Sequence, residues 1–338
     1  MPAVSVLIPC YNAADTLTET LTSVSRQTHP NFEVVTVDDG STDGTGEILK
    51  TWAAREARFR VLSRPHEGII PALNAGLDHC QAPYIARLDA DDLAHPDRLS
   101  IQAAYLDSDP DTALVSSLVS GFPEEDLRQG FRIYLDWLNA LVTHEEIARE
   151  IFVESPLPHP SVMFRKSSVT ALGGYQEHGW AEDYDLWLRM FLAGERFAKI
   201  PQDLVSWREH PQRLTRTDGR YSLENFLRAK AHYLARGPLR DRDAVIVWGS
   251  GMMGRRLGKQ LQRQDMPLVA FVDIDPKKIG RTRRGLPIIA PDDLLPWWRR
   301  YQNPVVLAAV GARGARVLIR ERLNGFGLRE GHHWWAAA

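Results

Sequence analysis

Three aspartates lie within four residues, in the sequence Asp-Ala-Asp-Asp at residues 89–92. Carboxylates this close together repel one another, so a folded chain keeps them together only where something positive binds. Sets of oxygen ligands suit hard divalent cations such as Mg²⁺ and Mn²⁺. Residues 84–88, just before them, form a short apolar run that predicts a strand. We therefore predict a site for a metal ion and a diphosphate at Asp89, Asp91 and Asp92.

A simpler alternative is that these acids serve the helix that Pro96 is predicted to open. Asp92 or Asp97 would then be its N-cap residue, because aspartate side chains accept hydrogen bonds from the first free N–H groups of a helix. Capping accounts for one aspartate and leaves the other two unexplained. The metal site is therefore the better interpretation.

Strand and helix patterns alternate along the first quarter of the chain. Apolar residues predict strands at residues 4–9, 32–37, 59–62 and 84–88, and helices at residues 14–26, around 48–52 and at 69–78. Such alternation predicts an α/β fold with a doubly wound parallel sheet, in which ligands bind at the carboxyl ends of the strands. Asp38 and Asp39 end the second strand, so we expect this pair and residues 89–92 to meet in one crevice.

The next part of the chain carries weaker patterns. Residues 100–155 are interpreted as helical, a strand is predicted at 161–164 and a helix at 180–189. The polar, turn-rich segment 236–243 marks a domain boundary. We therefore expect a first domain at residues 1–238 and a second domain at residues 239–338.

The expected second domain begins with the order of a dinucleotide-binding fold. A predicted strand leads into Gly-Ser-Gly-Met-Met-Gly at residues 249–254 and a helix, and the next predicted strand ends on Asp273. In such a turn Gly249 permits the tight bend and Gly251 lets the backbone approach a diphosphate. Gly254 lets helix and strand pack closely, and Asp273 would bind a ribose hydroxyl. Two interpretations stay open, a nucleotide or dinucleotide site and a degenerate fold used for docking or dimerisation.

Charge is divided unevenly between the two expected domains. Residues 1–238 hold 23 lysines and arginines against 34 aspartates and glutamates, a net charge of −11. Residues 239–338 hold 18 against 9, a net charge of +9. Such a split argues for two units with different partners. The basic unit could meet an anionic ligand or make peripheral contact with an anionic membrane, or it could be a solvated face without a partner.

The composition is that of a globular protein, without a run of 18 apolar residues and without a signal-peptide pattern. The two cysteines, Cys10 and Cys80, cannot make a disulfide framework or a zinc site. We therefore expect a cytoplasmic protein that binds no nucleic acid. Association with the inner face of a membrane and the oligomeric state are left open.

Five motifs in order resemble those of a family 2 glycosyltransferase, a nucleotide-diphospho-sugar transferase with the GT-A fold. The resemblance covers residues 4–225 and rests on VSVLIPCYN (4–12), VDDGSTD (37–43), LDADD (88–92), HPS (159–161) and AEDYDLW (181–187). It implies a GT-A doubly wound mixed sheet, followed here by a small Rossmann-like α/β domain.

The resemblance assigns roles in binding the donor. Asp39, beside Asp38, would accept the imide N–H of a pyrimidine base. Uracil and thymine carry that donor and cytosine does not, so the contact would favour UDP- or dTDP-sugars. Backbone around Pro9 and Tyr11 would hold the base and ribose.

The resemblance also assigns the metal ligands. Asp89 and Asp91 form the DXD pattern, and Asp91 is the first choice for a Mg²⁺ or Mn²⁺ ligand, with Asp92 next. The ion would bridge both phosphates and offset the charge that builds on the leaving nucleoside diphosphate. His210 matches a late histidine motif near the diphosphate, where Arg208 or Arg213 could add charge.

Asp183 is the general base that the resemblance implies. It would take the proton of an acceptor hydroxyl in the transition state, while the hydroxyl attacks the anomeric carbon with inversion. Asp183 lies in the first turn of a predicted helix, where the helix dipole favours the ionised form. Glu182 points about 100° away around that helix and cannot share the role. The alternative is that both are ordinary acids at a helix start, and His159 is expected to pack beneath the acceptor site.

The sequence therefore predicts a metal-dependent inverting glycosyltransferase that moves a sugar from a nucleotide donor to a saccharide acceptor, which could be lipid-linked. One alternative is an NAD(P)-dependent, sugar-modifying oxidoreductase built around the C-terminal fingerprint. That enzyme would need a proton relay such as Tyr-x-x-x-Lys, and residues 244–338 contain no such motif. A third interpretation is a binding protein without activity, against which the intact acidic clusters argue.

Overall fold

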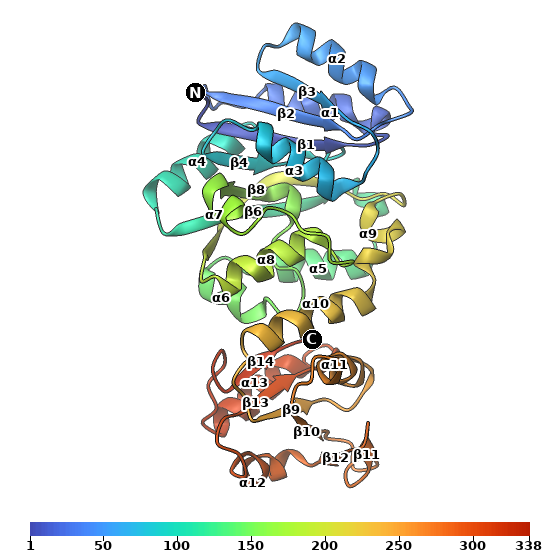
Figure 1. Cartoon of the computed structure of the whole chain (residues 1–338), viewed down its shortest axis with the longest axis vertical. Coiled ribbons are helices and arrows are strands. Elements are labelled where there is room, and N and C mark those ends of the chain that lie inside the picture. Colours follow the sequence, from blue (N-terminus) through green and yellow to red (C-terminus); the bar gives the residue numbers. More distant parts are fainter. The chain divides into compact units, whose positions relative to one another are not determined.

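The computed structural model describes all residues from 1 to 338 (Figure 1). The chain forms two compact units. The first consists of Met1–Ile147, Pro156–His178 and Glu182–Thr217, and the second of Ala148–Ser155, Gly179–Ala181 and Asp218–Ala338. The boundary expected between residues 238 and 239 therefore falls inside the second unit.

The first unit is built on an eight-stranded sheet in the order β3-β2-β1-β4-β7-β6-β8-β5. The strands are β1 (Val4–Cys10), β2 (Phe32–Asp38), β3 (Phe59–Ser63), β4 (Tyr84–Arg87), β5 (Leu93–Ala94), β6 (Thr112–Phe122), β7 (Met163–Arg165) and β8 (Arg196–Arg208). Strands β1 to β4 run parallel, whereas β7 is antiparallel to both of its neighbours and β5 is antiparallel to β8. The sheet is therefore mixed, as the resemblance implied, and its parallel half is formed by the first four strands of the chain.

Helices follow the parallel strands as the apolar spacing predicts. The helices that begin in this unit are α1 (Ala14–Ser25), α2 (Thr45–Arg55), α3 (Ile69–His79), α4 (Arg98–Ser108), α5 (Gln129–Asn139), α6 (His144–Glu150), α7 (Lys166–Ala171), α8 (Glu182–Leu192) and α9 (Leu214–Thr217). Helix α1 shows the principle, because its buried residues Leu17, Leu21 and Val24 recur at intervals of three and four. Helix α3 packs so closely on the sheet that a Cβ at Gly76 would lie 2.2 Å from Leu7.

Two long strands lie where the sequence indicated something else. Strand β6 runs through the middle of the stretch 100–155 that was interpreted as helical, and β8 was not predicted. The helix expected at Pro96 begins at Arg98, and Asp97 at its N-cap makes no side-chain cap bond. The Asp97 carboxylate instead accepts a hydrogen bond from Thr28 Oγ1 at 2.8 Å. Since Asp92 precedes β5, neither acid caps the helix, and the capping alternative is wrong.

The second unit holds a six-stranded sheet in the order β11-β12-β10-β9-β13-β14. Its strands are β9 (Ala244–Trp248), β10 (Leu268–Val272), β11 (Thr282–Arg283), β12 (Leu286–Ile289), β13 (Pro304–Ala308) and β14 (Trp334–Ala336), and its helices are α10 (Leu223–Arg236), α11 (Met252–Arg263), α12 (Leu294–Trp298) and α13 (Ala315–Gly325). All pairs except β11–β12 are parallel. The order of the five parallel strands is the doubly wound 3-2-1-4-5, with the switch point between β9 and β13.

Two glycines of the turn after β9 are required by the fold itself. Gly249 has φ +122°, and a Cβ there would lie 2.7 Å from the carbonyl oxygen of Ala309. A Cβ at Gly254 would lie 1.8 Å from the carbonyl oxygen of Gly249. Gly251 precedes α11, and a Cβ there would meet nothing within 4 Å. The packing of the fold therefore does not require a glycine at position 251.

The segment Ala148–Ser155 joins the second unit through charged and aromatic contacts. The buried carboxylate of Glu150 binds Arg316 Nη1 at 2.6 Å and Arg320 Nη2 at 2.7 Å. The Lys230 ammonium donates to the Val153 carbonyl at 2.6 Å, and Phe152 packs edge-on against Trp335. The second unit therefore includes a segment that lies far from the rest of the unit in the sequence.

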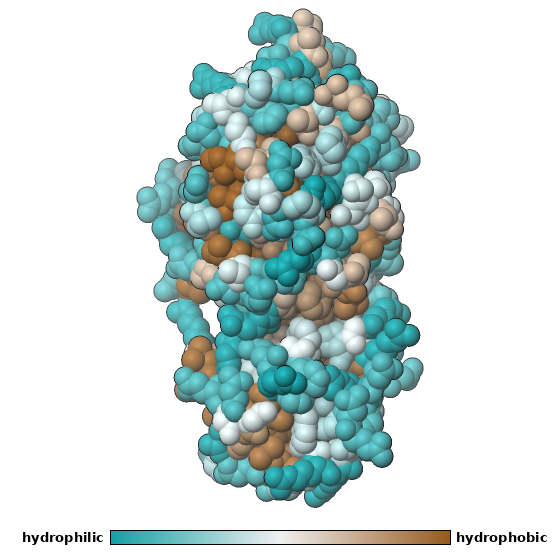
Figure 2. Space-filling view, turned by 90° about the vertical axis from the view of Figure 1, so that its left-hand side faces the viewer, coloured by the Kyte–Doolittle hydropathy of each residue, from teal (hydrophilic) through white to brown (hydrophobic).

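The surface carries no large apolar belt on the face drawn in Figure 2, where apolar residues form separate patches among hydrophilic ones. No helix of the chain has the length and apolar character that crossing a membrane requires.

Candidate functional site

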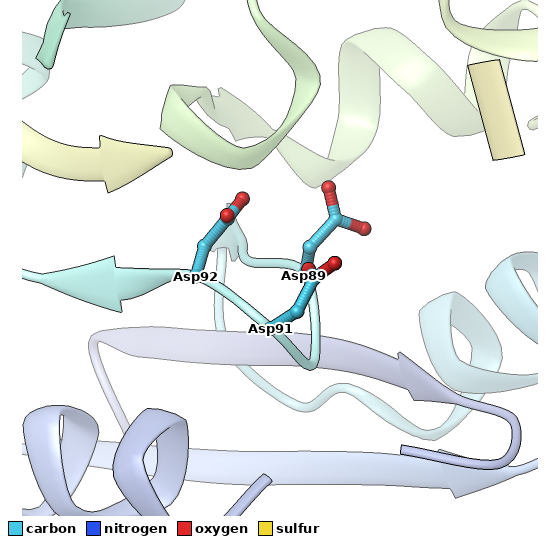
Figure 3. A group of neighbouring side chains, drawn as sticks. All are labelled: Asp89, Asp91 and Asp92. Carbon is cyan, nitrogen blue, oxygen red and sulfur yellow. The ribbon is translucent and has the colours of Figure 1, made fainter. Parts of the chain in front are cut away.

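The three predicted acids lie in the turn that joins β4 to β5. Figure 3 shows their side chains pointing to the same side of this turn. One carboxylate oxygen from each of Asp89, Asp91 and Asp92 lies within 4.8 Å of the others. We call residues 89–92 the acid loop.

The surroundings of Asp92 and Asp89 disfavour the negative charge of both carboxylates. Asp92 is fully buried; its Oδ1 accepts the Arg208 backbone N–H at 2.7 Å, but its Oδ2 has no hydrogen-bond donor. Burial, with Asp91 and Asp89 adding to it, raises the pKa of Asp92 well above its usual range. Burial also raises the pKa of Asp89, although the ion pair with the buried Arg87 works against it.

These observations test whether a divalent cation fits the acid loop. The three aspartates offer carboxylate oxygens as metal ligands, and Mg²⁺ and Mn²⁺ prefer such ligands. The Oδ2 atom of Asp92 is buried without a partner, and buried polar atoms are usually satisfied. A cation would supply both the missing partner and the missing positive charge, so the residues present fit the ion.

His210 lies at the acid loop, where its Nε2 is 2.8 Å from Asp91 Oδ2. That hydrogen bond raises the pKa of His210, and partial burial only moderates the effect. The two arginines expected near the diphosphate both have partners within the protein. Arg208 Nε donates to the Asp91 carbonyl at 2.7 Å, and Arg213 pairs with Glu209 at 2.8 Å and stacks over the Trp207 ring.

The residues expected to hold the nucleoside form a second cluster. The Asp39 carboxylate accepts backbone N–H groups of Glu67 at 3.2 Å and Gly68 at 2.8 Å, and lies 2.8 Å from His66 Nδ1. The half-exposed ring of Tyr11 stacks on His66, with ring centroids 3.9 Å apart. Sequence reasoning missed His66, since nothing in its spacing links it to Asp39.

The neighbours of this cluster have structural contacts of their own. Asp38 is buried, and its Oδ1 accepts the Ser41 N–H at 3.0 Å, which closes the turn after β2. Pro9 lies in β1, one position before Cys10, which pairs with Asp38 in the sheet. The structure therefore brings Asp38, Asp39, Pro9 and Tyr11 to the carboxyl ends of β1 and β2.

Asp183 is the second residue of α8, directly after Glu182, and is partly exposed. Burial and then the charge of Glu182 raise the pKa of Asp183 to about 8, against the opposing effect of Arg87. This corrects the expectation that the helix dipole keeps Asp183 ionised, because desolvation and a neighbouring acid outweigh the dipole. The charge of Asp89 acts in the same direction, which places Asp183 within electrostatic reach of the acid loop. A carboxylate with a raised pKa accepts a proton more readily, as a general base must.

A buried polar network lies next to Asp183. His159 Nε2 hydrogen-bonds the Tyr175 hydroxyl at 2.8 Å, and its Nδ1 lies 4.0 Å from Glu182. Burial and the nearby Arg87 lower the pKa of His159 well below its usual range, so the ring is neutral. Arg87 was missed from the sequence, although a charged residue inside an apolar strand before Asp89 was a usable signal.

The C-terminal fingerprint lies in the second unit. Asp273 Oδ2 accepts hydrogen bonds from the Ser250 N–H and hydroxyl and lies 3.2 Å from Lys278 Nζ, while Oδ1 accepts the Asp275 N–H. Burial works to raise the pKa of Asp273, but these hydrogen bonds outweigh it and lower the pKa. Asp273 therefore ties the turn after β9 to the end of β10.

Comparison of the sequence with known families and proteins gives consistent matches. The sequence model of "Glycosyl transferase family 2" matches residues 5–173. The amylovoran biosynthesis glycosyltransferase AmsE of Erwinia amylovora is 34% identical over 210 residues, covering 60% of this chain and 75% of that protein. The putative glycosyltransferase EpsE of Bacillus subtilis is 34% identical over 229 residues, covering 66% and 79%.

Solved structures show the same fold. The chain matches S. aureus TarS 1–349 in complex with UDP with a TM-score of 0.56 and 19% identity, over 78% of this chain and 71% of that one. It matches the mannosyltransferase PcManGT of Pyrobaculum calidifontis, in complex with GDP-Man and Mn²⁺, with a TM-score of 0.51 and 23% identity, over 70% and 64%. The oxidoreductase alternative finds no support among these matches.

Proposed function

Because the chain belongs to glycosyl transferase family 2, we propose that it transfers a sugar from a UDP- or dTDP-sugar to a saccharide hydroxyl, with a divalent cation and with inversion. The observation that carries the proposal is the acid loop, whose three carboxylates converge and leave a buried Asp92 oxygen without a partner. The name of AmsE supports a role in polysaccharide biosynthesis.

The donor would bind across the two acidic clusters. Asp39 would accept the imide N–H of uracil or thymine, and Tyr11 and the backbone at Pro9 would hold the base and ribose. TarS has been solved with UDP, which supports a pyrimidine donor. Asp39 already accepts two backbone N–H groups and lies 2.8 Å from His66 Nδ1, and the two oxygens of a carboxylate together offer about four lone-pair sites.

Asp91, Asp92 and Asp89 would hold Mg²⁺ or Mn²⁺, and PcManGT has been solved with Mn²⁺. When bound, such an ion offsets the charge that builds on the leaving diphosphate. The hydrogen bond to Asp91 raises the pKa of His210, so a protonated His210 would add positive charge on the same side of the loop.

Asp183 would act as the general base. The acceptor oxygen forms a bond to the anomeric carbon as the bond from that carbon to the diphosphate oxygen breaks, and the hydroxyl proton passes to the Asp183 carboxylate. Attack from the face opposite the leaving group inverts the anomeric configuration. Glu182 stays buried beside it and raises its proton affinity.

The C-terminal part, residues 239–338, is proposed to be a Rossmann-like module that binds a nucleotide or dinucleotide at Gly249, Gly251 and Gly254. The doubly wound strand order and the turn at its switch point support this. A ribose at Asp273 would have to share that carboxylate with Ser250. The charge of +9 supports peripheral contact with an anionic membrane, where a lipid-linked acceptor would lie.

Transfer from a panel of UDP-, dTDP-, CDP- and GDP-sugars tests the proposal directly. Purified protein with Mn²⁺ would be incubated with each donor and a mixture of saccharide acceptors, and products would be followed by mass spectrometry and proton NMR. We expect turnover with a UDP- or dTDP-sugar and a product of inverted anomeric configuration. A product with retained configuration, or turnover only with GDP- or CDP-sugars, would contradict the proposal.

A further inference from the structure

The backbone of the acid loop is held from two sides. The Ala90 carbonyl accepts hydrogen bonds from Thr16 Oγ1 at 3.1 Å and from the buried Thr20 Oγ1 at 3.0 Å, both on α1. The next carbonyl, that of Asp91, accepts Arg208 Nε at 2.7 Å from the end of β8. Two consecutive carbonyls of the loop therefore have fixed donors that come from other elements.

Arg208 makes three further contacts with the loop and its surroundings. Its backbone N–H donates to Asp92 Oδ1 at 2.7 Å, and its Nη2 pairs with Glu19 Oε2 of α1 at 2.5 Å. Its guanidinium lies 4.4 Å from the centre of the Phe122 ring. The side chain is 18% exposed, so these contacts use most of its surface. Arg208 is therefore anchored on three sides, and its direct use by a phosphate would break existing contacts.

Three repelling carboxylates need such anchoring if they are to bind an ion. Without fixed backbone contacts the acids of the loop would separate, and the ion would have to bring them together again. Groups that orient metal ligands typically change metal affinity by about 10–100-fold when they are removed. Arg208 carries a positive charge, but its Nε donates its hydrogen bond to the Asp91 backbone carbonyl and not to a carboxylate of the loop.

We propose that Arg208, anchored by Glu19, is a positioning residue that holds the acid loop ready for the metal ion and does not bind the diphosphate itself. This inference rests on the proposed function, since it presupposes a metal-assisted donor site. It replaces the role that the sequence suggested for Arg208.

The two roles predict opposite effects for Glu19, which is the basis of the test. If Arg208 contacted the diphosphate, removing the negative charge of Glu19 would free the guanidinium and strengthen nucleotide binding. If Arg208 positions the loop, removing Glu19 loosens the guanidinium and weakens metal binding. The Glu19 side chain is 62% exposed, so its replacement leaves the fold intact.

The experiment measures Mn²⁺ and UDP binding by isothermal titration calorimetry, first UDP in EDTA and then Mn²⁺ at saturating UDP. The variants are Arg208→Gln, Arg208→Lys and Glu19→Gln. The matched control is Asp15→Asn, which removes an exposed acid one turn earlier on the same helix. Thermal melting by circular dichroism checks that each variant is folded.

For Arg208→Gln we expect Mn²⁺ affinity to fall by about 10–100-fold. Glu19→Gln should lose up to about fivefold, as removal of a largely exposed ion pair does. Arg208→Lys should recover part of the loss, Asp15→Asn should bind as wild type, and UDP affinity in EDTA should be unchanged in all four.

Two results would overturn the inference. The first is weaker UDP binding by Arg208→Gln in EDTA together with stronger binding by Glu19→Gln, which would assign Arg208 to the diphosphate. The second is wild-type Mn²⁺ affinity in both variants. A wild-type protein whose UDP binding ignores Mn²⁺ would instead contradict the proposed function, so the two failures are distinguishable.

Discussion

Replacement of Glu150 should destabilise the second unit strongly, although this residue lies more than 80 positions before the sheet that it supports. Glu150 is 3% exposed and ends α6. Its two carboxylate oxygens bind Arg316 and Arg320, and Arg320 is also paired with Glu330 at 2.8 Å. In Glu150→Ala both arginines lose their buried partner.

The magnitude follows from the burial of the three groups. Removing one partner of a buried ion pair costs about 3–5 kcal/mol. The two arginine side chains are 27% and 21% exposed, so water compensates part of the loss. We therefore expect Glu150→Ala to lower the free energy of unfolding by about 3 kcal/mol. Glu150→Gln keeps the shape and loses charge-assisted hydrogen bonds, for an expected loss of about 2 kcal/mol.

Urea unfolding followed by tryptophan fluorescence and by circular dichroism measures this effect, since Trp334 and Trp335 lie in the second unit. The matched control is Glu145→Gln on the same helix, whose side chain is 73% exposed and whose pair with Arg196 spans 3.6 Å. That control should change the free energy by less than about 0.5 kcal/mol. If Glu150→Gln unfolds like the control, segment 148–155 is not part of the second unit, and the reasoning is refuted.

Three further predictions concern the base, a buried lysine and the glycine turn. Asp183→Asn should keep donor affinity while transfer falls by about 10²–10⁴; because the base must be deprotonated, the wild-type rate should rise with pH up to about 8, and a flat pH profile would exclude this role. Burial lowers the pKa of Lys199 from 10.5 to about 7, so between these values the unfolded chain binds more protons and the free energy of unfolding should rise with pH. Lys199→Met should flatten this rise. If urea unfolding at pH 7 and pH 9 gives the same change in free energy for Lys199→Met as for the wild-type protein, the assignment is wrong. Gly254→Ala should destabilise the second unit, since its Cβ would lie 1.8 Å from the Gly249 carbonyl, whereas Gly251→Ala should be tolerated; equal melting temperatures for the two variants would contradict this packing.

The parallel half of the first sheet was predictable because its strands are continuous apolar runs that helices follow at regular spacing. Strand β6 was hidden because the buried Ser116 and Ser117 interrupt its apolar pattern. Strand β8 was hidden because it contains the buried Lys199 and the exposed polar residues Gln202 and Asp203. Both strands are stabilised by pairing with strands that lie far away in the sequence, and a local sequence pattern contains no information about such partners.

The acid loop was predictable because its three carboxylates lie within four consecutive residues of the sequence. The distant partners that hold it were not, since Thr16 and Arg208, with Glu19 behind it, come to the loop only after the chain folds. The protonation of Asp183 was misjudged for a related reason. A helix dipole can be inferred from sequence, but the burial that outweighs it depends on the packed structure.

The central claim is metal-assisted binding of a nucleoside diphosphate at the acid loop, and one titration tests it most directly. UDP and dTDP would be titrated into wild-type protein and Asp91→Ala by calorimetry, in EDTA and in Mn²⁺. We predict that Mn²⁺ raises the affinity of the wild-type protein and leaves that of Asp91→Ala unchanged, because the variant lacks a carboxylate of the cluster. Equal affinity of the wild-type protein in EDTA and in Mn²⁺, or the same Mn²⁺-dependent gain in Asp91→Ala, would contradict the claim.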